Sequence, residues 1–403
     1  MMNRIRHLRR DESGMQFVFV GFGFMAFMAA SMLAIDVGLL LTARTQAQTS
    51  ADAGALAGAT ALVFNSFTDH TAGGPAVTSA MNTARANLVV RQTPSVLPDD
   101  VTFPFNATTG QFDQVQVTVY RTQERSNPVA TLVAAFYGSP SANIAATATA
   151  MAAPATGMSC VLPFTIPDKW TEMQCAVETC PWAPTDSFNM FETQGNHANA
   201  GAPLPNPDVY VPPGQQGATG YKLASDMGLL LTLKPSSQNE VSPSFYNAWD
   251  IGDVTGASAY GDNIAGCNPG YTEVGNDMLP ETGNMVGPTN QNTKALIDQD
   301  PNARWDASCN NGVGCVVGWD KAKYPLQSPR IRPVPLYDPV LYAQDQHSGK
   351  SWPTLKIVSY IGFFIESVDN GGTVKGRIVP MLGTFNPNAP VAGEFARAIV
   401  LVK

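Results

Sequence analysis

Residues 15–62 read MQFVFVGFGFMAFMAASMLAIDVGLLLTARTQAQTSADAGALAGATAL, and this stretch decides how the chain is organised. No formal charge occurs from Met15 to Ile35, where Phe, Met and Ala dominate. An α-helix rises about 1.5 Å per residue, so a segment of this length matches a hydrocarbon layer roughly 30 Å thick. The sequence therefore predicts a membrane-spanning helix over residues 15–35.

Beyond Ile35 the stretch keeps a helical pattern but changes its surface. Charged residues enter at Asp36, Arg44 and Asp52, while alanine recurs every four residues at positions 47, 51, 55 and 59. Residues four apart lie on one face of a helix, so these alanines form a narrow face on which another element can pack closely. We expect one helix to leave the membrane after Ile35 and to continue to about residue 65.

The residues before the apolar run indicate its orientation. Arg4, Arg6, Arg9 and Arg10 precede it, and the positive-inside rule places such a basic segment in the cytoplasm. A cleaved secretory signal is the competing interpretation, because it also begins with basic residues followed by an apolar run. The run is longer than the 7–15 residues typical of a signal-peptide core, which favours an uncleaved anchor.

Composition describes the part of the chain beyond the span. The 403 residues are 44% hydrophobic and only 14% charged, with 35 Gly, 31 Pro and a formal net charge of −8. Enough apolar residues are present for a core, and the many turn formers favour a loop- and β-rich exterior over long salt-bridged helices. The acidic balance argues against nucleic acid as a partner.

A series of short motifs follows the basic tail in a fixed order. Gly14 precedes the apolar run, Asp36-Val37-Gly38 follows it, and Ala51-Asp52-Ala53-Gly54-Ala55 comes further along. This order and spacing resemble the N-terminal region of Flp pilus-assembly TadG-like proteins over about residues 10–62. The resemblance implies family-motif positions at Gly14, Gly38, Ala51, Asp52 and Ala55, and Gly54 stands where that family more often has alanine.

Type IV pilins and the Tad pseudopilins share a related design and must be compared. They are processed after a glycine and carry a glutamate at the fifth mature position, inside the apolar run. Processing after Gly14 would place Phe19 at that position, and no acidic residue lies between Gly14 and Asp36. The chain therefore resembles the unprocessed TadG-like branch, and we interpret Asp36 as a carboxylate at the outer headgroup level, where the helix emerges.

All six cysteines follow the predicted span, which suits an oxidising compartment and up to three disulfides. Six cysteines allow 15 pairings, so the sequence leaves the connectivity open. The short separations within Cys175/Cys180 and Cys309/Cys315 favour local bridges. Structural zinc is not expected, because no Cys-x-x-Cys pair occurs. The disulfide candidates are Cys160, Cys175, Cys180, Cys267, Cys309 and Cys315.

Periodicity predicts an α+β fold after the helix. Residues 80–90 fit a second helix or its run into a strand, and residues 115–120 read as a strand because polar and apolar residues alternate. Residues 145–152 are ambiguous, since their alanines favour a helix while Thr147 and Thr149 alternate; the family resemblance implies a strand, which we expect. Composition then shifts at Pro154 towards a region rich in Pro, Gly, Asn and Trp. A short helix is expected over 293–303. Final strands at 355–365, 373–382 and 395–402 are expected to complete the sheet begun near Val115.

These observations divide the chain into four predicted parts. Residues 1–14 form a cytoplasmic basic tail, 15–35 the transmembrane helix, 36–153 the helix extension with a small helix-on-sheet domain, and 154–403 a loop- and β-rich periplasmic domain that contains disulfides.

Motifs for catalysis are missing from the sequence. It has no Gly-x-Ser-x-Gly elbow, His-Glu-x-x-His helix or Walker loop. We therefore expect that the chain is not an enzyme, binds no cofactor and has no catalytic residue. Acidic and amide residues gather at 186–192, 250–253 and 261–263, where calcium is a hypothesis and solvated turns are the alternative. None of these segments fits the twelve-residue calcium loop, so no metal ligand is predicted.

The resemblance implies a function in assembly. It describes a single-pass protein of the bacterial inner membrane, part of a Tad or Flp pilus or a tight-adherence secretion apparatus, that contacts pilin, pseudopilin or other Tad assembly proteins. Two alternatives remain open. An anchored adhesin or matrix-binding module would use the Trp- and Gly-rich region as its surface, and an anchored hydrolase would need a site that the sequence does not reveal.

Overall fold

The structure is a computed structural model that describes residues 13–65, 67–107, 109–173, 181–192, 207–236, 240–252 and 255–402. Contacts divide the described chain into two compact units. The first contains α2 up to Ala59, together with residues 70–150 and the last residues of the chain, and the second contains residues 60–69 and 151–400. The predicted limits at residues 35/36 and 153/154 remain predictions.

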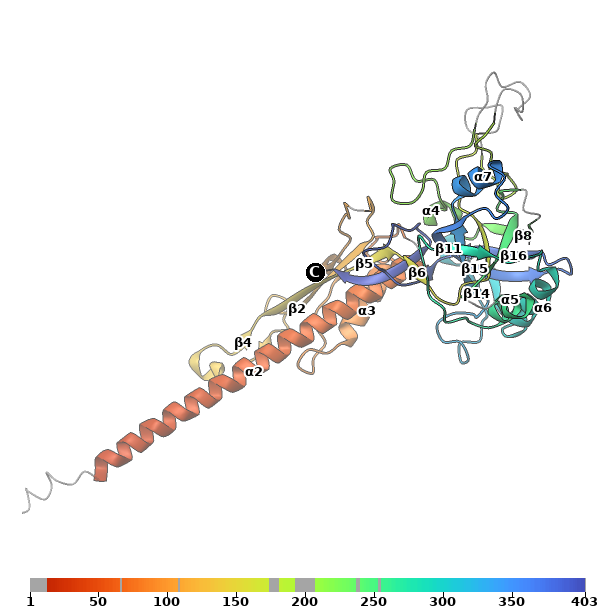
Figure 1. Cartoon of the computed structure of the whole chain (residues 1–403). Helices are drawn as coiled ribbons and strands as arrows, with labels where there is room; N and C mark the ends of the chain where they lie inside the picture. Colours follow the sequence, from red (N-terminus) through yellow and green to blue (C-terminus); the bar gives the residue numbers. More distant parts are fainter. Residues whose placement is uncertain are drawn as a thin grey trace, which may run out of the picture. The chain divides into compact units, whose positions relative to one another are not determined.

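One helix dominates the first unit, as the sequence predicted. Helix α2 runs from Ser13 to Phe64 without interruption (Figure 1). A second helix, α3 (Pro75–Ala86), packs against it. It begins at a proline, which suits the first helical turn, and ends at Ala86, so the segment expected at 80–90 is helical and starts earlier.

A small sheet completes the first unit. Strand β2 (Gln114–Arg121) buries Val115, Val117 and Val119 on alternate positions, and β5 (Ile144–Pro154) does the same with its alanines. Both strands were predicted, the first from this alternation and the second with the help of the family resemblance. Threonines link their other faces, since the hydroxyls of Thr118 and Thr147 are 3.0 Å apart. The remaining elements are η1 (Pro98–Asp100), β1 (Val101–Thr102), β3 (Val129–Ala130), η2 (Ala134–Tyr137) and β4 (Ser141–Ala142).

A closed, mixed sheet forms the centre of the second unit. The strand order β14-β15-β16-β8-β9-β7 returns to β14, and β11 pairs with both β15 and β9. Figure 1 labels β8, β11, β14, β15 and β16 of this sheet. Parallel pairs occur between β7 and β14 and between β8 and β9, whereas the other neighbours are antiparallel. Its strands are β7 (Phe164–Pro167), β8 (Leu230–Pro235), β9 (Phe245–Asp250), β11 (Asp277–Pro280), β14 (Ile331–Tyr337), β15 (Leu355–Val368) and β16 (Val374–Val379).

This closed sheet is a barrel, and apolar residues lie on both of its faces. Strand β15 is buried almost continuously from Leu355 to Ile365, which explains its largely apolar sequence. One buried cluster includes Phe164, Leu231, Val334 and Phe363, and a second cluster gathers around Trp170 and Trp249. The other elements of this unit are β6 (Gly157–Met158), α4 (Leu223–Asp226), α5 (Ala257–Ala265), β10 (Thr272–Glu273), α6 (Val286–Asp298), β12 (Arg304–Asp306), η3 (Asn310–Gly312), β13 (Cys315–Val317), α7 (Pro339–His347), β17 (Met381–Leu382) and β18 (Ala396–Val402).

Two expectations about this region need correction. The strand predicted at 355–365 and most of the strand predicted at 373–382 do not extend the sheet begun near Val115, because β15 and β16 belong to the barrel. The end of the second segment, β17, does join that sheet, and so does β18, as predicted for 395–402. The helix expected at 293–303 begins earlier, at Val286, and ends at Asp298. Its Pro288 falls in the first turn, where a missing N–H is tolerated, so the proline does not delay the helix.

The fold class is confirmed. The chain is α+β, with a long N-terminal helix that continues into a helix-on-sheet unit, followed by a β-rich unit that contains disulfides.

Candidate membrane anchor and assembly surface

The N-terminal part of α2 exposes its apolar side chains. Its most apolar 18-residue window is 0% buried. Phe17 is 83% exposed and Met25 70%, while Met15 and Ile35, at the two ends of the predicted span, are 58% and 54% exposed. Among the described residues this is the one helix that is long and apolar enough to cross a membrane. A continuous apolar surface of this kind marks a membrane or protein contact.

Asp36 follows directly and is buried, with 5% of its surface exposed. Its carboxylate accepts three backbone hydrogen bonds, from the N–H groups of Leu132 (2.8 Å), Val133 (2.9 Å) and Ala134 (2.7 Å). These amides begin η2, whose first N–H groups would otherwise have no partner. Asp36 therefore holds the hairpin formed by β3, η2 and β4 against α2.

Small residues line the face of α2 that packs on its own unit. Ala47, Ala51, Ala55 and Ala59 are all 0% exposed, as the four-residue spacing predicted. Gly54 belongs to the same face, and a Cβ atom there would lie 2.9 Å from Ala84 Cβ and 3.0 Å from the Ala80 carbonyl oxygen. This close approach gives a physical reason for glycine at that position.

Polar groups along α2 bind neighbouring backbone. Ser50 Oγ donates to the Ala84 carbonyl at 2.8 Å, and Gln46 Oε1 accepts from the Val90 N–H at 2.7 Å. Gln48 Nε2 donates to the Thr147 carbonyl of β5 at 3.3 Å, in addition to Asp52 Oδ1 of its own helix at 2.8 Å. These contacts fix the rotation of α2 within the first unit.

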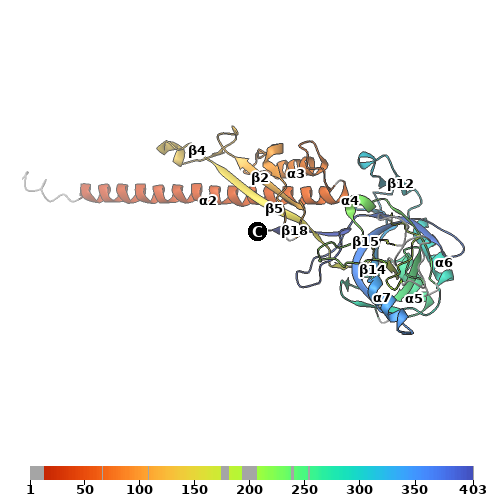
Figure 2. The ribbon, with the colours of Figure 1, turned by 90° about the horizontal axis from the view of Figure 1, so that it is seen from above.

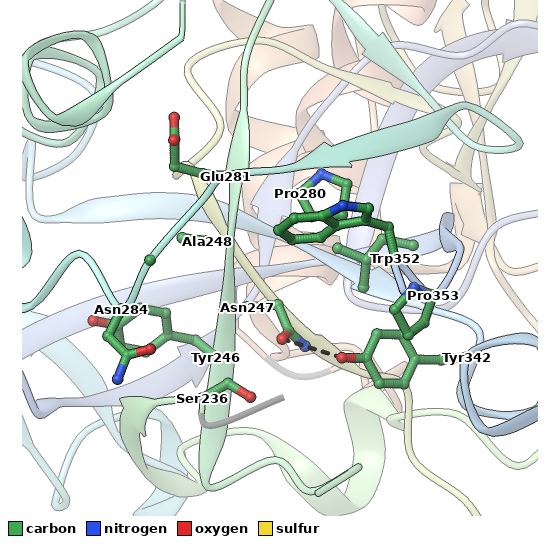
Figure 3. A pocket seen from close by; sticks show the side chains of 12 residues that line it. Ser236, Tyr246, Asn247, Ala248, Pro280, Glu281, Asn284, Tyr342, Trp352 and Pro353 are labelled. Carbon is green, nitrogen blue, oxygen red and sulfur yellow. Dashed lines mark hydrogen bonds between the residues drawn. The ribbon is translucent and has the colours of Figure 1, made fainter. Parts of the chain in front are cut away.

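A small pocket in the second unit lies between β9 and the segment that precedes β15. Its volume of about 30 Å³ leaves room for water but is far below the roughly 300 Å³ of a small-molecule site. Figure 3 shows Asn247 and Tyr342 facing each other across it, with Trp352 close by. Tyr342 Oη donates to Asn247 Oδ1 at 3.4 Å, and Asn247 Nδ2 donates to Tyr337 Oη at 3.4 Å.

A wider hollow lies elsewhere in this unit, with a volume of about 330 Å³. Phe188, Met190, Phe191 and His347 are among its lining residues, and the rings of Phe191 and His347 stack with centroids 4.3 Å apart. Within the described part of the chain, no group of three or more His, Cys, Asp or Glu side chains is arranged to hold a metal ion. Asp253, in one of the loops considered for calcium, lies outside that part.

Two disulfides occur among the described residues. Cys309 pairs with Cys315, as the short separation suggested, and Cys160 pairs with Cys267 across 107 residues. Cys175 and Cys180 lie outside the described residues, so their local bridge remains a prediction.

Helix α2 contains the part of the sequence that matches a known protein family. Residues 16–61 match the Tad family, Flp pilus-assembly TadE/G-like. The match confirms the resemblance and lies entirely within α2. Comparisons with curated proteins and with solved structures gave no match.

The TadE/G-like segment, residues 16–61, contains six of the eight residues predicted for the anchor and the family motif. They lie in two different environments along α2. Gly38 lies on the exposed side, where an added Cβ atom would meet no other atom within 4 Å, and Asp52 is half-buried. Ala51 and Ala55 are fully buried in the first unit. Gly14, just before the segment, is likewise exposed with open space around it.

Sequence reasoning missed the partners of the TadE/G-like segment. The amides that Asp36 binds lie 96–98 residues away in the chain, and no local pattern connects them to it. One signal was present, since an acidic residue directly after an apolar run needs a partner or water at that point. Nothing in the sequence indicated which of the two it would find.

Proposed function

We propose that this chain is a membrane-anchored structural component of a Tad or Flp-type pilus-assembly or tight-adherence secretion apparatus. Residues 15–35 span the bacterial inner membrane, the basic N-terminus lies in the cytoplasm, and the two units lie in the periplasm. The role is one of interaction rather than catalysis, and the partners are pilin, pseudopilin or other Tad assembly proteins.

One observation carries this proposal: the TadE/G-like match coincides with a helix that exposes an apolar N-terminal half and packs the other half on its own unit. Such a helix suits an anchor that supports a domain beyond the membrane. The disulfides are consistent with an oxidising compartment such as the periplasm.

Deletion and complementation test the role. Deleting the gene is expected to abolish or reduce pili, and the intact chain should restore them. A variant with Phe22→Arg and Phe27→Arg should fail to restore them and should leave the membrane fraction, because each arginine costs about 2.5–3.5 kcal/mol at the centre of a membrane helix. The matched control, Phe22→Leu with Phe27→Leu, should behave as the intact chain.

The two outcomes separate the parts of the proposal. Unchanged pilus production after deletion would exclude the assembly role. Membrane retention of the double-arginine variant would exclude residues 15–35 as the anchor.

The hollow beside His347 favours a second candidate function, an anchored adhesin or matrix-binding module. Its volume falls within the range of ligand sites, and aromatic side chains line it. Binding of the full chain to glycans or host cells, lost on Phe191→Ala but kept on Phe105→Ala in the first unit, would support that function. Equal binding by both variants would count against the hollow.

A further inference from the structure

We propose that the hairpin formed by β3, η2 and β4 (residues 129–142) is a second contact with the membrane. It rests in the lipid–water interface beside the point where α2 leaves the bilayer. This inference rests on the proposed anchoring of residues 15–35. It adds a surface of the first unit and names its partner, the outer lipid surface of the same membrane.

The position of the hairpin is the first argument. Asp36 comes one residue after the end of the apolar run, and its carboxylate binds the amides of Leu132, Val133 and Ala134. The tip of the hairpin is therefore held at the level where the span ends. Figures 1 and 2 both show β4 beside α2, and the part of α2 before the hairpin has no other described element of the first unit next to it.

The chemistry of the hairpin is the second argument. Residues 131–138 read TLVAAFYG, and no charged residue occurs from Ser126 to Pro167. Leu132 is 61% exposed, and Ala135 is also exposed. An uncharged tip that exposes Leu132 and Ala135 is typical of a segment at the membrane interface.

Backbone pairing makes this location compatible with lipid. The Thr131 N–H donates to the Pro140 carbonyl (3.1 Å), and the Ser139 N–H to the Ala134 carbonyl (2.9 Å). Thr131 Oγ1 also donates to the Ser139 carbonyl at 2.6 Å. Polar backbone groups without partners are costly near lipid, so internal pairing together with the Asp36 carboxylate lowers the cost of dehydrating the tip.

The exposed face of α2 indicates the same depth for the lipid–water interface. Val37 and Leu41 are 47% and 62% exposed, so apolar side chains continue beyond Ile35. At about 1.5 Å per residue, Leu41 lies roughly 9 Å beyond Ile35, within the 5–10 Å depth of interfacial segments. Arg44 is the first charged residue after Asp36, whose own charge is enclosed by the three amides.

A depth measurement tests the proposal on the full chain in lipid nanodiscs. The fluorophore NBD is attached to Ala135→Cys, and its quenching by lipids with a nitroxide near the headgroup is compared with that by mid-chain nitroxides. Met25→Cys reports on the anchor, and Leu88→Cys is the matched exposed control in the first unit. Leu88 is 52% exposed and lies near Val90, whose N–H binds Gln46, ten residues further along α2 than Asp36.

We expect a blue-shifted emission from NBD at residue 135 and stronger quenching by the headgroup nitroxide than by the mid-chain nitroxide. NBD at residue 88 should not be quenched by either lipid. Asp36→Ala should release the hairpin and lower quenching at residue 135 while that at residue 25 is unchanged. The unsubstituted chain measures background labelling.

Each contrary result has its own meaning. Quenching at residue 25 without quenching at residue 135 would overturn the second contact and leave the anchor intact. No quenching at residue 25 would instead overturn the proposed anchoring itself. If the NBD at residue 135 is protected from aqueous iodide but is not quenched by the lipid nitroxides, protein covers the tip. That result also overturns the lipid contact. Unaltered quenching at residue 135 in Asp36→Ala would contradict the proposal that Asp36 holds the hairpin in place.

Discussion

Asp250 and Glu281 place two carboxyl groups within hydrogen-bonding reach in the second unit, because β9 and β11 pair side by side. Burial, together with the hydrogen bond and negative charge of Glu281, raises the pKa of Asp250 to about 7. The hydrogen bond from Asp250 lowers the pKa of Glu281. The pair therefore holds one proton between them near neutral pH, in the manner expected for two carboxylates that share a site.

Between pH 4.5 and about 7 this pair predicts a stability that decreases as the pH rises, because Glu281, whose pKa is lowered from 4.5, is already charged in that range. Asp250 binds a proton in the folded chain up to about pH 7 but in the unfolded chain only up to its ordinary pKa of 3.8. Its stabilising contribution is thus present below pH 3.8 and is lost as the pH rises through about 7. The slope for one extra bound proton is at most about 1.4 kcal/mol per pH unit.

Asp250→Asn should flatten this dependence, whereas Asp262→Asn, at an exposed helical position of α5, should not. The free energy of unfolding, measured by urea titration at several pH values, gives the comparison. Asp168 contributes with the same sign, since its complete burial raises its pKa to about 6, so part of the slope should remain in Asp250→Asn. A dependence identical to that of the intact chain would contradict the shared proton.

At the scale of elements, the contact between α2 and α3 depends on the lack of a side chain. Gly54→Ala should destabilise the first unit, because the new methyl group would lie 2.9 Å from Ala84 Cβ and 3.0 Å from a backbone oxygen. Overpacking of this kind costs about 1–3 kcal/mol, which exceeds the roughly 1 kcal/mol that alanine gains over glycine within a helix.

Gly38→Ala is the control, since open space surrounds that position. It should keep or slightly raise the melting temperature, measured by circular dichroism on the full chain in nanodiscs, while Gly54→Ala lowers it. Equal melting temperatures for the two variants would mean that α3 moves aside at little cost.

The two described disulfides close loops of very different length in the second unit. Cys160 and Cys267 are separated by 107 residues, and Cys309 and Cys315 by 6. If the bridges act on the entropy of the unfolded chain, the long loop contributes about 5 kcal/mol and the short loop about 2 kcal/mol. Replacing Cys160 and Cys267 by serine should therefore lower the unfolding free energy more than replacing Cys309 and Cys315. A larger loss from the short loop would show that local geometry outweighs loop length.

For the whole molecule, the sequence predicts elements better than their arrangement. Helix α2 and strands β2 and β18 follow from local patterns such as an apolar run, alanines spaced by four and apolar strand segments. The segment of β5 was ambiguous by itself, and the family resemblance decided it. The barrel depends on pairings such as Thr165 Oγ1 with the Pro335 carbonyl, 170 residues apart, and no local pattern specifies such a partner. The same holds for Asp36, whose chemistry was visible but whose three amides were not, whereas the short Cys309–Cys315 loop could be inferred from spacing alone.

The apolar part of α2 and the part that packs in the first unit are separate, which leads to a prediction for truncated chains. The apolar part of the helix is 0% buried, so its removal takes away no packing. A chain that begins at Asp36 should leave the membrane fraction and still unfold at the temperature of the full chain. A chain that begins at Thr45 loses Ala43, which is 0% exposed, and the Asp36 cap of the hairpin.

The shorter chain should therefore melt at a lower temperature, because three amides would lose a charged acceptor and a hydrogen bond to a charged group contributes about 1.5–3 kcal/mol. Differential scanning fluorimetry of both truncations, with sedimentation of membranes to follow their location, makes the comparison. Early melting of the chain that begins at Asp36 would mean that residues before it support the fold as well as the anchor. Equal melting of both truncations would mean that the Asp36 cap contributes little, and that the alanine face from Ala47 onward is sufficient to hold the first unit together.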